Sequence, residues 1–96
     1  MKTISFASHI SWQILPNQKM GFAYNIREKK YYEFENTELV IWNFLANKYE
    51  TDEESVIEEV ARFYKIDKNI IRNDIESFLD TLYERGLLKI NGTDKY

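Results

Sequence analysis

Apolar and polar residues alternate along the first third of the chain, whereas further on the apolar residues recur every three or four positions. A period of two is typical of strands, and the longer spacing is typical of helices. The alternation predicts three strands, at 11–15, 20–27 and 30–34. Turn-forming residues at 16–19 and a tight connection at 28–29 separate them, which favours an antiparallel meander.

Two helices are predicted next. The first covers about 37–48, where an apolar stripe with helical spacing begins. Thr51 and Glu54 then have the spacing of a capping box, in which the Thr hydroxyl and the Glu carboxylate each accept a backbone N–H. A second helix is therefore expected to start at this box and to end at the break formed by Lys65 and Ile66.

A third helix completes the predicted elements. Asp67 is placed to cap its start, it runs to about Arg85, and Gly86 suits the left-handed conformation that ends many helices. Residues 87–90 then form an extended apolar run that must pack back on the core. The order predicts an α+β fold that is winged helix-turn-helix-like: a three-stranded antiparallel sheet followed by three α-helices, which cover one face of the sheet.

Size and composition indicate a single domain spanning residues 1–96. The mass is 11.6 kDa, and 44% of the residues are hydrophobic, as in a packed globule. The core is expected over about 11–90, with 1–10 as an extra strand or a loose arm and 91–96 as a polar tail. Neither a secretory signal nor a run of ~20 apolar residues is visible, so we expect a cytoplasmic protein without a membrane partner.

Side chains suited to catalysis are scarce. Cysteine is absent and His9 is the single histidine, which excludes disulfides, thiol nucleophiles and thiolate zinc sites. The acidic residues at 52–54 and 58–59 lack the glycine-interrupted spacing of a calcium loop and fit a solvated helix face. No serine has the context of a nucleophile, and no glycine-rich phosphate loop is present. We therefore expect no catalytic residue, no metal, no cofactor and no enzymatic activity.

A winged-helix DNA-binding regulator is the main alternative, because three helices with a small sheet also describe that class. The formal net charge is −3, and residues 36–66 carry three basic against seven acidic side chains. DNA binding gains affinity from clustered basic residues. The third helix instead mixes both signs, at Lys68, Arg72, Asp74, Glu76 and Asp80. We expect no nucleic acid partner, and a small structural or oligomerisation module remains a further alternative.

The strand predicted at 30–34 closes the meander and leaves one row of backbone N–H and C=O groups unpaired. Such an edge is a template for an added strand, and Tyr31 and Tyr32 would offer that strand apolar surface. A helix or loop covering the edge is the alternative, with both tyrosines simply packed. The same edge could also pair with a second copy of the chain and form a homodimer.

Short motifs follow one another in a fixed order. The first group is Gly21-Phe22-Ala23-Tyr24-Asn25, Lys30-Tyr31-Tyr32-Glu33-Phe34, Asn36-Thr37-Glu38 and Ile41-Trp42. The second group is Asp74-Ile75, Phe78-Leu79, Leu82 and Gly86-Leu87-Leu88. Over about 11–90 the series resembles the PqqD-like family, peptide chaperones also called RiPP recognition elements. Phe34 and Glu38 depart from the Leu and Gly that are usual in that family.

The resemblance implies a non-catalytic module that binds the leader segment of a ribosomally made precursor peptide and presents it to a modifying enzyme, often a radical SAM maturase. In such families the leader adds an antiparallel strand to the third strand, in the groove beside the last helix. The implied strand residues are Lys30, Tyr31, Tyr32, Glu33 and Phe34. On the last helix, the implied pocket floor is Ile71, Ile75 and Leu79, and the implied charged flank is Lys68, Arg72 and Glu76.

Overall fold

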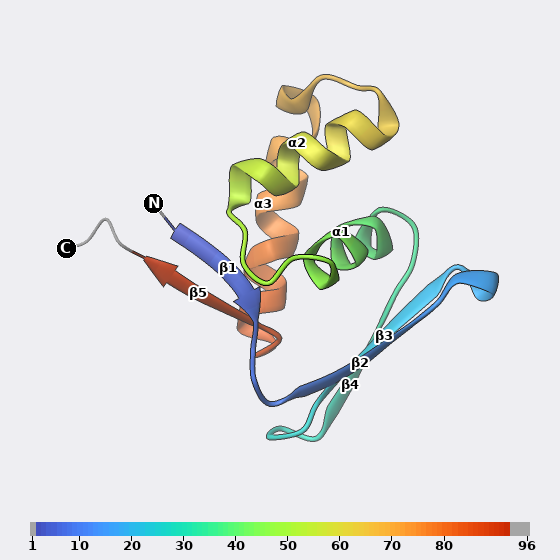
Figure 1. Ribbon diagram of the computed structural model, residues 1–96, viewed down its shortest axis with the longest axis vertical. Helices are drawn as coiled ribbons and strands as arrows, with labels where there is room; N and C mark the ends of the chain where they lie inside the picture. Colours follow the sequence, from blue (N-terminus) through green and yellow to red (C-terminus); the bar gives the residue numbers. More distant parts are fainter. Residues whose placement is uncertain (1, 93–96) are drawn as a thin grey trace.

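The structure is a computed structural model that describes residues 2–92, with side chains over 3–91 (Figure 1). Its elements are β1 (Lys2–Phe6), β2 (Ile10–Leu15), a 3-10 turn (Pro16–Gln18), β3 (Met20–Asn25), β4 (Lys30–Phe34), α1 (Thr37–Ala46), α2 (Glu53–Tyr64), α3 (Lys68–Glu84) and β5 (Leu88–Gly92). The predicted α+β fold is confirmed, because a three-stranded antiparallel meander is followed by three helices. No helix in the described part is long and apolar enough to cross a membrane.

The strands form two sheets rather than one. The meander has the order β2-β3-β4, and β1 pairs antiparallel with β5 in a separate two-stranded sheet. Figure 1 shows the two sheets diverging from the turn that joins β1 to β2. The first residues therefore form a strand, which was one of the two expectations for them. This strand pairs with β5 and not with the meander. The expectation that all three helices cover one face of the meander was wrong, because among the strands α2 packs mainly against β1 and α3 mainly against β5.

A stack of three aromatic rings joins the two sheets. Trp42 of α1 lies between Phe6 of β1 and Phe34 of β4, with ring centroids 4.4 and 4.7 Å away. Aromatic rings bury more apolar surface than other side chains, so this stack anchors the core. The fully buried apolar residues are Ile4, Ala23, Phe34, Ile41, Trp42, Leu45, Val56, Ile57, Val60, Ile75, Leu79, Leu82, Leu87 and Leu88.

The segment between α1 and α2 differs from the prediction. Helix α1 ends at Ala46 instead of 48, and α2 is capped by Asp52, whose carboxylate accepts from the Ser55 N–H at 2.8 Å. Thr51 is not the cap, because its backbone exchanges hydrogen bonds of 2.6 and 2.9 Å with Ile4 of β1. The carbonyl of an N-cap residue accepts the first hydrogen bond of the helix. The Thr51 carbonyl is already bonded to Ile4, and the Asp52 carbonyl accepts from the Val56 N–H at 3.2 Å, so the cap lies one position along the chain.

The start of α3 agrees with the prediction, and its end differs by one residue. The Asp67 carboxylate accepts from the Asn69 N–H at 2.8 Å, and the helix ends at Glu84. Gly86 has a φ of 75°, the left-handed conformation expected there. Strand β3 stops at Asn25 rather than 27 because the hairpin turn occupies 26–29. Of the predicted tail, 91–92 belong to β5, and 93–96 lie outside the described residues.

Candidate functional site

Strand β4 is an edge strand beside α3. Within residues 2–92 it pairs only with β3, so its other edge is open. Two contacts hold α3 near it. The rings of Phe34 and Phe78 meet edge to face at 6.0 Å, and the Arg85 guanidinium lies 4.6 Å from the centre of the Tyr32 ring. We give the name β4–α3 groove to the open edge of β4 together with the neighbouring face of α3.

The strand register identifies which backbone groups of β4 point outward. The Ile26 N–H donates to the His9 carbonyl at 2.9 Å, so this pair is hydrogen-bonded, and bonded pairs alternate along an antiparallel ladder. Both pairings are unbroken, so successive residues of β3 bond alternately to β2 and to β4. In this alternation the backbone of Ala23 bonds to Tyr32 of β4. Consequently Lys30, Tyr32 and Phe34 bond to β3. The N–H and C=O groups of Tyr31 and Glu33 face the open edge.

The side chains of β4 alternate between two environments. Phe34 is buried and Tyr32 half-buried on the side of the helices, whereas Tyr31 and Glu33 are exposed on the outer side. The Tyr31 hydroxyl donates to the Glu33 carboxylate at 2.9 Å. Partial desolvation, then this hydrogen bond and the carboxylate charge, raise the pKa of Tyr31. The phenol is therefore harder to ionise than a free tyrosine and remains the donor in this hydrogen bond.

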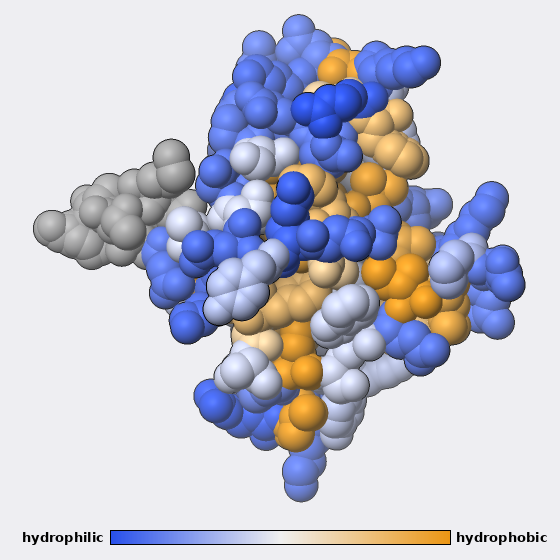
Figure 2. Space-filling model, in the orientation of Figure 1, coloured by the Kyte–Doolittle hydropathy of each residue, from blue (hydrophilic) through white to orange (hydrophobic). Residues whose placement is uncertain are grey.

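The apolar residues implied for the helix wall lie at different depths. Ile71 is half-buried, but Ile75 and Leu79 are each only 1% exposed and belong to the core. Phe78 is also half-buried, and it is the α3 side chain in ring contact with β4. On the face shown in Figure 2, hydrophobic surface gathers between α1 and the hairpin end of β2 and β3, with hydrophilic side chains around it. The accessible apolar floor is therefore Ile71 and Phe78.

The basic residues implied on α3 face α2. Arg72 donates to both carboxylate oxygens of Glu54, at 2.8 and 3.2 Å. Lys68 donates to Glu54 at 3.2 Å and to Glu58 at 3.5 Å. The hydrogen bond from Arg72, and after it the one from Lys68, lowers the pKa of Glu54 to about 2. Glu76 is half-buried near the same cluster and acts electrostatically on Arg72.

Three residues at the base of the groove were missed as site residues: Asn25, Phe78 and Arg85. Asn25 is 0% exposed, and its Nδ2 donates to the carbonyl oxygen of Arg85 at 2.8 Å. The sequence placed Phe78 on the apolar stripe of the third helix and Arg85 at the end of that helix. These patterns show where each residue lies on the helix but not that it contacts β4. Asn25 was part of the family motif series, but its contact could not be read from the sequence because its partner lies 60 positions further along the chain.

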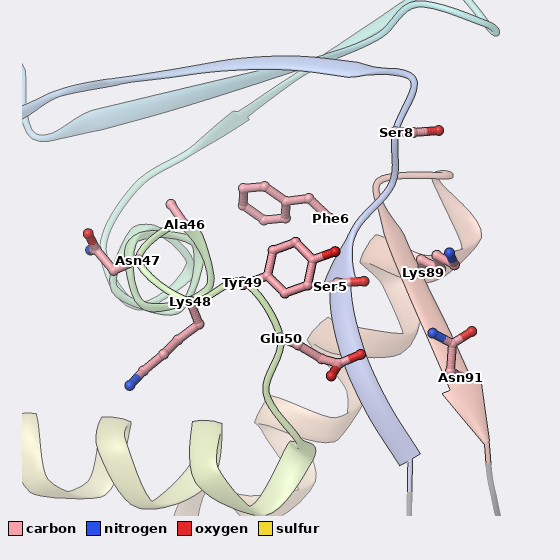
Figure 3. Close-up of a pocket in the computed structure, with 10 residues that line it drawn as sticks. All are labelled: Ser5, Phe6, Ser8, Ala46, Asn47, Lys48, Tyr49, Glu50, Lys89 and Asn91. Atoms are coloured by element: carbon pink, nitrogen blue, oxygen red, sulfur yellow. The ribbon is translucent and has the colours of Figure 1, made fainter.

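A separate hollow of about 570 Å³ lies between β1, β5 and the segment after α1 (Figure 3). Phe6 forms part of its lining, and Tyr49 is 95% exposed at the same place. The remaining lining residues are Ser5, Ser8, Ala46, Asn47, Lys48, Glu50, Lys89 and Asn91. Across the described part of the chain, no group of three or more His, Cys, Asp or Glu side chains could hold a metal ion. The hollow is distinct from the β4–α3 groove.

The fold and the open edge define a small α+β domain in which a strand edge lies beside the last helix. The sequence matches the family described as "Coenzyme PQQ synthesis protein D (PqqD)" over residues 21–88. The chain therefore belongs to the PqqD family, and the resemblance is confirmed. No curated protein matches the sequence significantly.

A solved structure shares the fold. It is described as "TbiB1 in Complex with the TbiA(beta) Leader Peptide" and superposes with a TM-score of 0.79 at 16% sequence identity. The match covers 94% of this chain and 99% of that chain. The match covers more of the chain than the family region does, so the fold likeness extends beyond residues 21–88.

Proposed function

We propose that the chain binds the leader segment of a ribosomally made precursor peptide as an antiparallel strand on β4, in the β4–α3 groove. It is a non-catalytic partner that presents the leader to a separate modifying enzyme, such as a radical SAM maturase. It acts in the cytoplasm, where precursor peptides are made. Membership of the PqqD family supports this function, as does the likeness to TbiB1, a protein whose structure contains a leader peptide.

The open edge of β4 is the observation that carries the proposal. Tyr31 and Glu33 turn their backbone N–H and C=O groups outward, and an added strand satisfies these groups whatever its sequence. The half-buried rings of Tyr32 and Phe78 lie beside this edge and offer apolar contact. Backbone pairing thus supplies affinity, and the side chains of the groove supply selectivity.

The other nominated residues take different roles in this proposal. Lys30 and Phe34 hold the strand in the sheet, and Ile71 extends the apolar floor. Ile75 and Leu79 support that floor from the core. Glu76, Lys68 and Arg72 form the charged flank of the groove. Because Lys68 and Arg72 already bind Glu54, their charges are compensated within this flank and do not attract a leader carboxylate.

The same edge also suits a homodimer. Two β4 strands related by a two-fold axis pair antiparallel, so each edge satisfies the other. Such a dimer occupies the groups that a leader would use. We therefore propose that self-pairing and leader binding are mutually exclusive, and that the leader displaces the partner copy.

A titration followed residue by residue tests the function. The synthetic leader peptide of a candidate precursor is added to ¹⁵N-labelled protein, and amide shifts are recorded. We expect the largest shifts at 30–34 and along α3, with nearly unchanged amides around the hollow of Figure 3. Sedimentation at the same concentrations measures any dimer and its loss on titration. Shifts centred away from β4, or none at all, would reject leader binding at this edge.

A further inference from the structure

Basic side chains gather at the beginning of β4. The turn before the strand carries Arg27 and Lys29, and the strand begins with Lys30; all three are exposed. The end of α3 adds Arg85, held over the Tyr32 ring. Around these four basic groups lie two acidic ones, Glu28 and Glu84. This end of the groove is therefore net positive.

Acidic side chains gather at the other end. Glu33 and Glu35 are exposed at the end of β4, and Glu38 follows in the first turn of α1. Helix α3 runs in the opposite sense to β4, since Arg85 meets Tyr32 and the earlier Phe78 meets Phe34. Asp74 lies one turn before Phe78, so it shares the face of α3 turned to this end.

Neighbouring basic groups do not cancel this acidic end. Lys68 and Arg72, the basic residues in the first turns of α3, are engaged by Glu54 and Glu58 of α2. The side chains of β4 and those of α3 therefore both change from basic to acidic along the groove, from the end beside Lys30 to the end beside Glu35. A single strand lying between them experiences one electrostatic gradient along its length.

We infer that the groove selects a guest strand by the order of its charges: basic residues in its N-terminal half and acidic residues in its C-terminal half. This inference rests on the proposed function and specifies its substrate. An antiparallel guest places its C-terminal half beside Lys30 and its N-terminal half beside Glu33 and Glu35. Opposite charges across an interface fix register and suppress wrong partners. The segment downstream of the leader therefore leaves the groove at the positive end, beside the 26–29 turn.

Strand β4 itself has this order of charges, which provides a probe. The capped peptide Lys-Lys-Tyr-Tyr-Glu-Phe-Glu copies 29–35, and its isomer Glu-Glu-Tyr-Tyr-Lys-Phe-Lys exchanges the two signs. Both are titrated into the labelled full chain at low salt. We expect the first peptide to bind on the order of tenfold more tightly, because each exposed charge pair contributes a modest free energy. We expect the preference to shrink in high salt as the charges are screened.

A pair of variants separates the local gradient from total charge. Lys29→Glu with Lys30→Glu reverses the positive end and should abolish or invert the preference. Lys19→Glu with Lys48→Glu changes the net charge equally at exposed positions outside the groove and should leave the preference intact. Equal affinity of both peptides, with shifts at Tyr31 and Glu33, would overturn the charge order and leave strand addition standing. No shift at these amides with either peptide would contradict strand addition itself.

Discussion

The Asn25 side chain joins the strand wall of the groove to its helix wall: Nδ2 donates to the carbonyl oxygen of Arg85 at 2.8 Å. On its other side, Oδ1 accepts from the Glu28 N–H at 3.0 Å and closes the turn between β3 and β4. Buried polar groups are costly unless they are hydrogen-bonded, and here both ends of the amide have partners. This one side chain therefore sets where α3 ends relative to β4.

Replacing Asn25 tests that role. We expect Asn25→Ala to lower the free energy of unfolding by about 1–3 kcal/mol, because the Arg85 carbonyl and the Glu28 N–H lose a buried partner. Leader affinity should fall as well, since one of the contacts that hold α3 to the sheet is lost. Urea denaturation and leader titration measure the two effects. Asn17→Ala, at an exposed turn position, is the control. A change within 0.5 kcal/mol, roughly that of a neutral surface substitution, would contradict the expectation.

Gly86 is constrained both by its backbone and by Asn25. Its φ is 75°, and an added Cβ would lie 2.5 Å from Asn25 Nδ2. We expect Gly86→Ala to cost at least about 1–2 kcal/mol from the left-handed conformation alone, with the clash in addition. In the Asn25→Ala background the clash disappears, so the second substitution should cost less than it does in the wild type. A double-mutant cycle by urea denaturation measures the difference, and strictly additive costs would show that the contact is unimportant.

Proline at Glu33 tests the outward direction of its N–H. Edge strands tolerate proline where the N–H faces solvent, so Glu33→Pro should fold about as stably as Glu33→Ala. The proline should nevertheless weaken leader binding at least about tenfold, because a hydrogen bond to the guest is lost and the ring obstructs the edge. Tyr32→Pro, by contrast, should destabilise the fold because Tyr32 bonds to β3. Calorimetric titration and urea denaturation distinguish the three variants. Equal leader affinity for the proline and alanine variants would place the guest elsewhere.

Stability should depend on pH through Glu54. Arg72, and after it Lys68, lowers the pKa of Glu54 to about 2 from an ordinary 4.5. Because the folded-state pKa is the lower one, the ion pairs stabilise the fold above pH 4.5, and this contribution is lost as the pH falls toward 2. The melting temperature of Glu54→Gln should therefore lie below that of the wild type at pH 7 and converge with it in acid.

The pH experiment has an internal control. Glu50→Gln alters an exposed carboxylate outside the helices and should follow the wild type across the whole range. The deficit of Glu54→Gln should be modest and should shrink in high salt, because all members of the cluster are partly exposed. A deficit that stays constant from pH 7 to pH 2 would show that the ion pairs do not cause it.

Local patterns were sufficient to predict the meander and the helices. The period-two alternation around Tyr31 and Tyr32, the Asp67 cap and the left-handed Gly86 each depend on neighbours within a few positions. The backbone conformations that these residues favour are intrinsic to short segments, which is why sequence alone indicates them. The same alternation identified the strand that forms the open edge.

Those local patterns did not predict the contacts between segments that are distant in the sequence. Thr51 pairs with Ile4 instead of capping α2, and β1 pairs with β5 instead of extending the meander. Glu54 of α2 likewise engages Arg72, which the helix pattern of α3 alone would leave facing a guest. Each of these contacts depends on which segments pack against each other when the chain folds, and the spacing of residues within one segment does not specify this.

The sequence by itself therefore determined the elements, the family resemblance and which strand closes the meander. That this strand keeps an open edge within residues 2–92 was decided by the tertiary structure. Tertiary structure alone decided the composition of the groove: Phe78 and Arg85 as its helix wall, Asn25 as the link between its walls, and a common charge gradient along both. The physical reason is that strands and helices form from interactions over a few residues. A groove exists only where two of them are brought together, here by the ring contact of Phe78 with Phe34 and by a hydrogen bond spanning 60 positions.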